Sequence, residues 1–397
     1  MFNFFKKSAN KSEKTAYLYE QLRPTWSKRD YSKFAKEAYL KNVIAHQAIK
    51  LISVAAASVQ LKLFSETKQG RSPITSHPIL RILSHPNPAQ NGKELLEALY
   101  SYRQISGNAY MLASGIVNNM PTELYALRPD YIQIKCSANI LPKSYIYKVG
   151  EKSIEFPIDK LTGFSRILHL KNFNPLCEVY GLSSIEAAAY SIDQHNQAGE
   201  WNQALLQNGA RPSGALIVNK EFGPLTERQY NDLKSQFNDS FSGPGNSGKP
   251  LLLEGGIEWK EMSLSPRDMD FITTKHSSAR DISLALGVPP QLLGIPGDST
   301  YSNLQEARLA FWEQTVIPLV DNTISHLSTW LSNFFGQWLE LTYDLDSVSA
   351  LSSRRDSLWK RIEDSSFMTI NEKRAAMGLP PLTDGNTLCH LPKTNQY

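Results

Sequence analysis

The segment 287–303 constrains this chain more than any other, because it requires a helix to end and a turn to follow. It opens with GVPPQLLG at 287–294. Gly287 can adopt the left-handed conformation that ends a helix, and Pro289 and Pro290 prevent that helix from resuming. The first helix is therefore predicted to stop at this glycine.

A second helix is predicted a few residues later. Pro296 and Gly297 form a turn signal. Ser302 or Asn303 then serves as an N-cap, with an amide or carboxylate side chain three residues farther on, which is the spacing of a capping box. The sequence thus predicts helix, exposed hinge and helix. On its own this arrangement is common, since most helix–loop–helix segments only turn a corner.

Further short motifs accompany the hinge along the chain. They are HPILRILSHPNP (77–88), SGNAY (106–110), LYALRPD (124–130), HLK (169–171) with YGLS (180–183), NGARPSG (208–214), and TINEKR (369–374) with GLPP (378–381). Their order, over roughly residues 35–385, resembles the portal proteins of tailed bacteriophages, of the Hong Kong phage type. Each motif is weak alone, and the shared order over nearly the whole chain is what makes the resemblance specific.

The resemblance implies a structural protein rather than an enzyme, and no cofactor. Portal subunits form a ring, dodecameric by resemblance, at one capsid vertex, through which an ATP-driven terminase pumps double-stranded DNA. The ring then retains the genome, attaches the tail and lets the DNA leave. The implied partners are other copies of this chain, the DNA, the terminase motor, the major capsid protein and a head-completion or adaptor protein. The implied location is the virion, with assembly in the host bacterial cytoplasm. The resemblance holds equally for an infectious phage, a prophage or a gene transfer agent.

The resemblance also divides the chain into parts. In chain order they are an N-terminal arm (1–40), a wing (41–182), a stem helix (183–210), a clip (211–264), a second stem helix (265–287), a tunnel loop (288–303), a kinked helix returning to the wing (304–345) and a short crown-like region (346–397). The implied DNA-facing residues of the tunnel loop are Asp298, Ser299, Thr300, Tyr301, Ser302 and Asn303. Small polar groups with a single charge suit weak, sequence-independent contacts with a DNA backbone.

The charge balance argues against a tight clamp on nucleic acid. The 397 residues include 42 basic and 38 acidic side chains, a formal net charge of +4. A protein that grips phosphates strongly carries a more basic surface, and its binding is strongly salt-dependent. Near neutrality fits a conduit through which DNA slides, and it fits equally a protein that never meets DNA.

Cysteine usage and hydropathy exclude other classes. The three cysteines lack close metal-type spacing, so neither a disulfide framework nor a zinc cluster is predicted. The N-terminus places bulky apolar residues before its charges, the wrong order for a signal peptide. Residues 43–59 form the most apolar helical stretch, but His46 and Lys50 make it too polar to span a bilayer. We expect a buried helix there and no membrane partner.

Helical patterns alternate with strand-like runs between residues 43 and 182, which predicts an α+β domain. The strand-like runs are NAYMLA (108–113), YIQIK (131–135) and ILHL (167–170). Ser183 and Glu186 then have the spacing of a capping box for one helix running to Asn208, about 40 Å long. Its apolar stripe is thin, which suits a helix that packs against neighbours in a ring.

The second half of the chain contains a mixed insertion and two further helical regions. The insertion combines ALIV (215–218), a helix-like stretch at 225–241, LLL (251–253) and IEWK (257–260). SPRD at 265–268 has the order of a helix start, with a cap, a proline and then an acid. Residues 346–397 are predicted to add two short helices.

A proline and an apolar seam mark the helix that follows the hinge. Pro318 should force a kink by removing one backbone hydrogen bond. Beyond it, apolar residues step by four and three along the helix; they are Val320, Ile324, Leu327, Leu331 and Phe334. This seam either buries itself inside the subunit or forms a contact between subunits.

GPGNSGK at 243–249 has the spacing of a phosphate-binding loop as far as its lysine. The next residue is Pro250, which supplies neither the hydroxyl that magnesium needs nor a backbone N–H for phosphate. The loop also follows a predicted helix and precedes a strand-like run, the reverse of a phosphate cradle. A Gly-, Ser- and Pro-rich clip loop is the favoured interpretation.

Scattered histidines and carboxylates leave an unassigned hydrolase as the alternative function. The eight histidines lack partners at metal-ligand spacing, and no Gly-x-Ser-x-Gly turn occurs. The pairs Asp268 with Asp270 and Glu258 with Glu261 are interpreted as solvated residues rather than as an acid/base pair. The sequence therefore predicts no catalytic site and no metal site.

Overall fold

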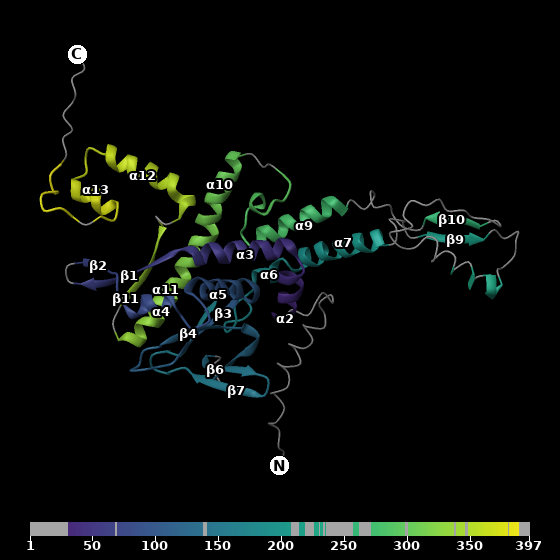
Figure 1. Ribbon diagram of the computed structural model, residues 1–397, viewed down its shortest axis with the longest axis horizontal. Coiled ribbons are helices and arrows are strands. Elements are labelled where there is room, and N and C mark those ends of the chain that lie inside the picture. The colour runs from purple at the N-terminus through teal and green to yellow at the C-terminus, as the bar shows by residue number, and fades with distance from the viewer. Residues whose placement is uncertain are drawn as a thin grey trace, which may run out of the picture.

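The fold was obtained as a computed structural model (Figure 1). It describes residues 31–67, 70–137, 141–207, 214–218, 226–229, 231–232, 235, 257–261, 271–297, 301–336, 339–345, 348–379 and 381–388. Several sequence predictions lie outside these residues. They are the glycine loop 243–249, most of the helix-like stretch 225–241, the run 251–253 and the helix start 265–268.

Helices make up most of the described chain. In chain order they are α2 (Tyr31–Lys33), the π-helical η1 (Phe34–Leu40), α3 (Val43–Ser58), α4 (Pro78–Ser84), α5 (Gly92–Ser106), η2 (Pro129–Tyr131), α6 (Ser184–Ala187), α7 (Ala189–Gln207), α9 (Phe271–Ala285), η5 (Pro290–Leu293), α10 (Tyr301–Phe311), the π-helical η6 (Trp312–Val316), α11 (Ile317–Phe335), η8 (Ser349–Leu351), α12 (Ser352–Asp364) and α13 (Ile370–Ala376).

The strands form small antiparallel sheets. They are β1 (Gln60–Thr67), β2 (Gly70–Ile74), β3 (Asn108–Ser114), β4 (Glu123–Leu127), β5 (Ile132–Cys136), β6 (Pro142–Val149), β7 (Lys152–Pro157), β8 (Ile167–Lys171), β9 (Gly214–Val218), β10 (Ile257–Glu261) and β11 (Leu339–Asp344). The sheet orders are β11-β1-β2, β4-β3-β8, β5-β6-β7 and β10-β9. The predicted runs at 108–113, 131–135 and 167–170 correspond to β3, β5 and β8, and the mixed content agrees with the predicted α+β class.

The main core lies between α3, α5, α11 and the sheet that contains β3. Ile49 and Ile52 on α3 are fully buried, as the sequence predicted for that helix. Leu95 and Leu99 on α5 are buried in the same cluster. Within the described chain, no helix combines the length and hydropathy that a membrane crossing needs.

Three of the short motifs meet where β3, β8 and the entry to α6 come together. Asn108 of SGNAY accepts a hydrogen bond from the Gly181 N–H of YGLS at 2.7 Å, and His169 of HLK lies 3.0 Å from the same Asn108 oxygen. The Asn172 N–H donates to the Gly107 carbonyl at 2.9 Å. A Cβ on Gly181 would lie 2.1 Å from that carbonyl oxygen, so two backbone segments touch here with no space for a side chain. We call this contact the glycine junction.

His169 is a structural residue of the glycine junction. Its ring stacks on Tyr110, with 4.5 Å between centroids. Burial, with a smaller effect from nearby Lys171, lowers the pKa of His169 to about 3. The Asn108 oxygen already accepts from Gly181. The neutral ring therefore donates through Nε2, and the prediction of a structural rather than a metal-binding histidine is consistent with this geometry.

The described helices differ in extent from two predicted segments. The N-terminal arm was predicted to extend to residue 40, but residues 31–40 form helical turns, and Ala38 is 1% exposed. The stem helix predicted from Ser183 to Asn208 is divided at Ala188 into α6 and α7. Ser183 does cap α6, because its hydroxyl accepts from the Ile185 N–H at 3.1 Å. Local capping signals thus located the start, but they did not reveal the break one turn later.

The helix after the hinge contains a wide turn ahead of Pro318. Residues Trp312–Val316 form a π-helical turn in which the Ile317 N–H bonds to the Trp312 carbonyl. Pro318 lies in the first turn of α11, just after it. A π turn is a common way for a helix to absorb a local conflict in its hydrogen-bond ladder. The sequence did not predict this widened turn, and the kink that it predicted at Pro318 stays a prediction.

The apolar seam of α11 lies inside the subunit. All five of its residues are buried, with Leu327 and Leu331 completely so. They belong to the same core cluster as α3 and α5. Of the two alternatives that the sequence left open, the intrasubunit one is correct.

Candidate functional site

The hinge between α9 and α10 begins with a tightly bonded helix end. Gly287 has φ +70°, the left-handed conformation predicted for it. The Val288 N–H bonds to the Ser283 carbonyl at 2.9 Å, and the Gly287 N–H bonds to the Leu284 carbonyl at 3.0 Å. These two bonds are the Schellman motif, which satisfies the last carbonyls of a helix. Thr315, which lies in η6, also fixes the turn, because its hydroxyl donates to the Gly287 carbonyl at 2.5 Å.

The same pattern is repeated one turn later. η5 ends at Gly294, which has φ +69°. The Ile295 N–H bonds to the Pro290 carbonyl at 3.2 Å, and the Gly294 N–H bonds to the Gln291 carbonyl at 3.5 Å. Val288 and Ile295 are 2% and 5% exposed, so both ends of this short turn are anchored in the subunit. The hinge up to Ile295 is therefore a defined structure.

Arg280 of α9 holds the next part of the hinge. Its Nη2 donates to the Pro296 carbonyl at 2.7 Å. A Cβ on Gly297 would lie 2.5 Å from the same Nη2, so the glycine allows the guanidinium to reach this carbonyl. The sequence identified the Pro-Gly pair as a turn signal, but the arginine that secures it lies 16 residues earlier and gave no local signal.

The predicted DNA-facing residues fall into two groups. Asp298, Ser299 and Thr300 lie outside the described residues. Tyr301, Ser302 and Asn303 form the first turn of α10, so the helix begins before Ser302 and Asn303, the two N-caps that the sequence predicted. Ser302 is exposed. Four residues, 297–300, thus separate the Pro296 carbonyl that Arg280 binds from the start of α10.

Polar contacts join the first turns of α7 to the second half of α9. The Ser191 hydroxyl donates to Asp281 Oδ2 at 3.3 Å, and the Ser278 hydroxyl donates to Gln194 Oε1 at 3.3 Å. Ile192 and Ile282 are buried between these contacts and the core. α7, which the sequence described as having a thin apolar stripe, therefore packs partly through hydrogen bonds.

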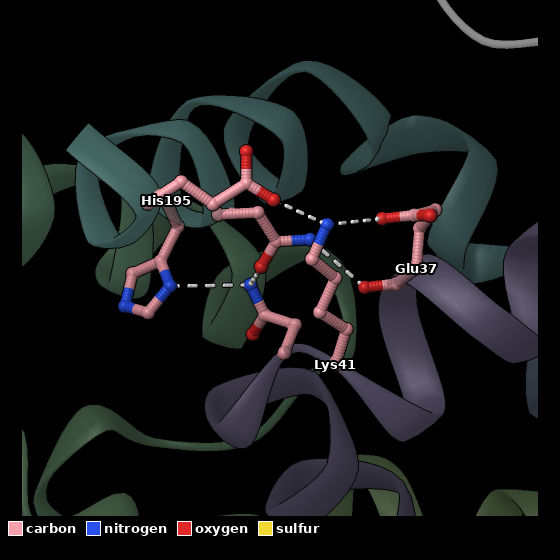
Figure 2. A network of polar contacts seen from close by, with 6 residues as sticks. Glu37, Lys41 and His195 are labelled. Atoms are coloured by element: carbon pink, nitrogen blue, oxygen red, sulfur yellow. Dashed lines mark hydrogen bonds and ion pairs between the residues drawn. The ribbon is translucent and has the colours of Figure 1, made fainter. Parts of the chain in front are cut away.

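A second polar network anchors α7 to the start of α3 (Figure 2). The Asn42 Oδ1 accepts from the Ile44 and Ala45 N–H groups and so caps α3. Its Nδ2 is therefore free to donate to Asn196 Oδ1 at 2.9 Å and to His195 Nδ1 at 3.2 Å. Lys41 bridges the two elements as well, through Glu37 at 3.1 Å and Glu200 at 2.5 Å. Asn42 is 1% exposed, so its hydrogen bonds lie at the buried side of the contact between α7 and the start of α3.

The contact between Asn42 and His195 requires a neutral imidazole. Nδ1 accepts from Asn42, and a proton on Nδ1 would face the amide donor. Burial, followed by the positive charge of Lys275 on α9, lowers the pKa of His195. Because the folded pKa lies below the unfolded value of about 6.5, this group contributes stability above about pH 6.5 and loses it as the pH falls.

We expect His195→Gln to flatten the fall in unfolding free energy between pH 7 and pH 5, because glutamine keeps an acceptor for Asn42 but takes up no proton. The measurement is the urea midpoint over a pH series at fixed protein concentration. Gln197→His is the control, since it adds an exposed histidine on the same helix, with little expected difference in pKa between folded and unfolded chains. An unchanged pH dependence in His195→Gln would contradict the assignment.

Other side chains that could act in catalysis or bind a metal are dispersed in the described structure. The described residues contain no group of three or more His, Cys, Asp or Glu that could hold a metal ion. Cys136 and Cys177 are both free thiols. The groups with the strongest structural roles are the hinge and the two polar networks on α7, and all of these position backbone rather than reacting atoms. Fold and site together define a scaffold that holds a short loop between two anchored helices.

Comparison with known proteins agrees with this class. The family model described as phage portal protein matches residues 44–378. The portal protein of enterobacteria phage HK97 is 25% identical over 350 residues, which cover 86% of this chain and 79% of that protein. A protein of Rickettsia bellii (strain RML369-C) is 46% identical over 352 residues, 89% of this chain and 90% of that one. A structure of the neck of a native gene transfer agent particle, computed with C12 symmetry, matches with a TM-score of 0.68 and 40% identity, over 91% of this chain and 96% of that chain.

The matched residues 44–378 include the glycine junction, the hinge and every helix from α4 to α13. This chain belongs to the phage portal protein family.

Proposed function

We propose that this chain is one subunit of a ring-shaped portal at one capsid vertex, through which double-stranded DNA passes during packaging and ejection. The observation that carries the proposal is the family match over 44–378, together with a 40% identical relative in a neck of C12 symmetry. That symmetry supports a ring of twelve copies for this chain. A cyclic ring closes through two different faces of each subunit.

The described elements suit the parts of a portal subunit. α7 and α9 lie side by side and form the stem, and β9 pairs with β10 beyond their far ends as the clip (Figure 1). The sheets β4-β3-β8 and β5-β6-β7 form the wing. The tunnel loop 288–303 is the part proposed to line the channel, and its described residues are fixed by the Arg280–Pro296 hydrogen bond before α10 begins. The terminase, the major capsid protein and a head-completion protein are the proposed partners.

The loop has a role in DNA handling that can be separated from ring assembly. We expect replacement of residues 298–300 by Gly-Ser-Gly to leave the ring intact and to lower the amount of DNA packaged or retained. The two helix ends, the Arg280 hydrogen bond and the buried Ile295 all lie outside the replaced residues. The paired measurements are native mass spectrometry of the purified ring and the length of encapsidated DNA.

The control is the same replacement at residues 160–162, an exposed turn between β7 and β8, which should leave DNA length unchanged. Normal filling and retention by the 298–300 variant would refute the channel role. Loss of the ring itself would identify the loop as an assembly element. A wild-type chain that stays monomeric at micromolar concentration, even with its capsid protein, would contradict the portal function as a whole.

The hydrolase alternative has no observation in its favour on the described residues. The portal family is structural, and the buried polar groups described above hold helices and sheets together. Pro250 stands in the glycine loop where a nucleotide site needs a hydroxyl. The portal is therefore the single function proposed.

A further inference from the structure

A row of exposed side chains runs along α9 toward the hinge. Its members are spaced by four, three and four residues, which places them on one side of the helix. They are Thr273, Ser277, Arg280 and Leu284, and all four are exposed. Ile282, on the opposite side of α9, is completely buried in the main core. Arg280 is the one charged member of the exposed row.

The subunit uses only part of the Arg280 guanidinium. Among the described residues, its side chain makes one polar contact, the 2.7 Å hydrogen bond from Nη2 to the Pro296 carbonyl. The neighbouring acid, Asp281, accepts a hydrogen bond from Ser191 on α7 instead. A guanidinium presents its N–H donors as parallel pairs on two edges, Nε with Nη2 and Nη1 with Nη2. A single bond from Nη2 therefore leaves one complete pair of donors for a ligand.

The bond to Pro296 places this guanidinium at the base of the tunnel loop. Ile295 is 5% exposed, whereas Pro296 and Gly297 are both exposed, so the chain leaves the core directly after Ile295. A Cβ on Gly297 would lie 2.5 Å from Nη2, and the glycine therefore lets the chain pass close to the arginine. A ligand that touches the tunnel loop at its base is also within reach of Arg280.

The free donors of Arg280 suit a phosphate group. A pair of parallel N–H donors binds two oxygens of one phosphate, and such charge-assisted pairs are stronger than a bond to a neutral carbonyl. Thr273 and Ser277, in the same row, add hydroxyl groups of the kind that contact a DNA backbone. Arg280 is also the only lysine or arginine between Lys275 and Arg308. The positive charge near the hinge is thus concentrated on this one side chain.

We propose that Arg280 binds the phosphate backbone of the passing DNA while the same guanidinium holds the Pro296 carbonyl. The inference rests on the proposed portal function. It assigns a DNA contact to a helix residue outside the tunnel loop 288–303, where the sequence pointed only to the side chains of 298–303. One such cation in each subunit attracts any DNA sequence, because phosphate contacts carry no sequence information. The near-neutral charge of the whole chain keeps that attraction weak enough for the DNA to slide.

The test measures how salt weakens the binding of a short blunt-ended duplex to rings of the full chain. Native mass spectrometry first establishes that each variant forms rings. Fluorescence anisotropy of the labelled duplex over a NaCl series then gives the slope of log Kd against log salt concentration. In Arg280→Gln we expect binding at low salt to weaken at least about tenfold and the slope to fall by at least about 1, the effect of losing a phosphate contact. Arg280→Lys keeps the charge and should restore most of the slope.

Arg81→Gln is the matched control, since it removes an exposed arginine on α4 and should leave both the affinity and the slope unchanged. A wild-type slope in Arg280→Gln rings overturns this inference alone. If those rings also dissociate at a lower urea concentration, Arg280 binds a carboxylate of a neighbouring subunit instead of a phosphate. Wild-type rings that bind no duplex at low salt likewise overturn only the phosphate contact. A wild-type chain that forms no ring overturns the proposed function and this inference with it.

Discussion

Gly181→Ala is expected to prevent the chain from reaching a stable fold. A Cβ at this position would lie 2.1 Å from the Gly107 carbonyl oxygen and 2.6 Å from the Asn172 N atom. Both are backbone atoms, and they bond to each other at 2.9 Å, so neither can turn away as a side chain would. The junction would have to open, which would also break the 2.7 Å bond from the Gly181 N–H to Asn108. We expect a loss of more than about 4 kcal/mol, the range of severe single substitutions.

Gly199→Ala is the matched control. Gly199 lies in α7, has no heavy atom within 4 Å of an added Cβ and has no positive φ. Alanine there should raise stability by about 0.5–1 kcal/mol through helix propensity. Soluble yield and the urea midpoint at fixed protein concentration distinguish the two variants. A Gly181→Ala protein with a wild-type midpoint would show that the glycine junction is not as close as described.

The glycine junction gives a physical meaning to motifs that the sequence alone could only match. SGNAY, HLK and YGLS lie far apart in the chain and meet at one point. That point joins the sheet containing β3 to the start of α6, and α6 leads directly into α7. The position of the proposed stem relative to the proposed wing is therefore set by a backbone contact that admits no side chain. Such a contact accounts for glycine at Gly107 and Gly181 without any role in binding.

Local signals made much of the fold predictable from sequence. The strands near 108, 131 and 167 followed from alternation and punctuation, and the buried helix at 43–59 followed from its composition. The end of α9 at Gly287 is a clear case, because a left-handed glycine followed by two prolines leaves the backbone few choices. These features depend on neighbours within a few residues, and the sequence displays such neighbours directly.

Long-range contacts account for what the sequence did not reveal. Asn42 contacts His195 across 153 positions, and Arg280 reaches a carbonyl 16 positions away. Polar residues of this kind look solvated in a linear sequence, because periodicity marks burial for apolar side chains only. The stem helix also breaks at Ala188, where no glycine or proline in the sequence marks the break. At the hinge, the anchoring residues were missed although the turn itself was predicted.

Arg103→Ala is the second substitution for which we expect a large effect. Arg103 is 6% exposed on α5, and its guanidinium donates to three neutral oxygen atoms. These are Asn172 Oδ1 at 2.9 Å, Thr323 Oγ1 at 3.0 Å and Asn322 Oδ1 at 2.7 Å. One side chain thus joins α5 to α11 and to the chain leaving β8. Burial lowers the pKa of Arg103, so the cation is held here against a desolvation cost.

The free energy of unfolding should fall by about 3–5 kcal/mol in Arg103→Ala, because the packing of the long aliphatic stem and the charged hydrogen bonds are lost together.

Arg103→Met separates the two contributions, since methionine restores most of the volume but none of the donors. It also removes the desolvated charge, which partly offsets the lost bonds. We therefore expect a smaller loss of about 1–3 kcal/mol, because the Asn172, Asn322 and Thr323 oxygens each lose one N–H donor. Arg81→Ala, at an exposed position on α4, should change stability by no more than about 0.5 kcal/mol. If urea unfolding shows Arg103→Met to be as stable as wild type, the hydrogen bonds do no more than compensate for burying the charge, and the stabilising role of Arg103 is one of packing alone.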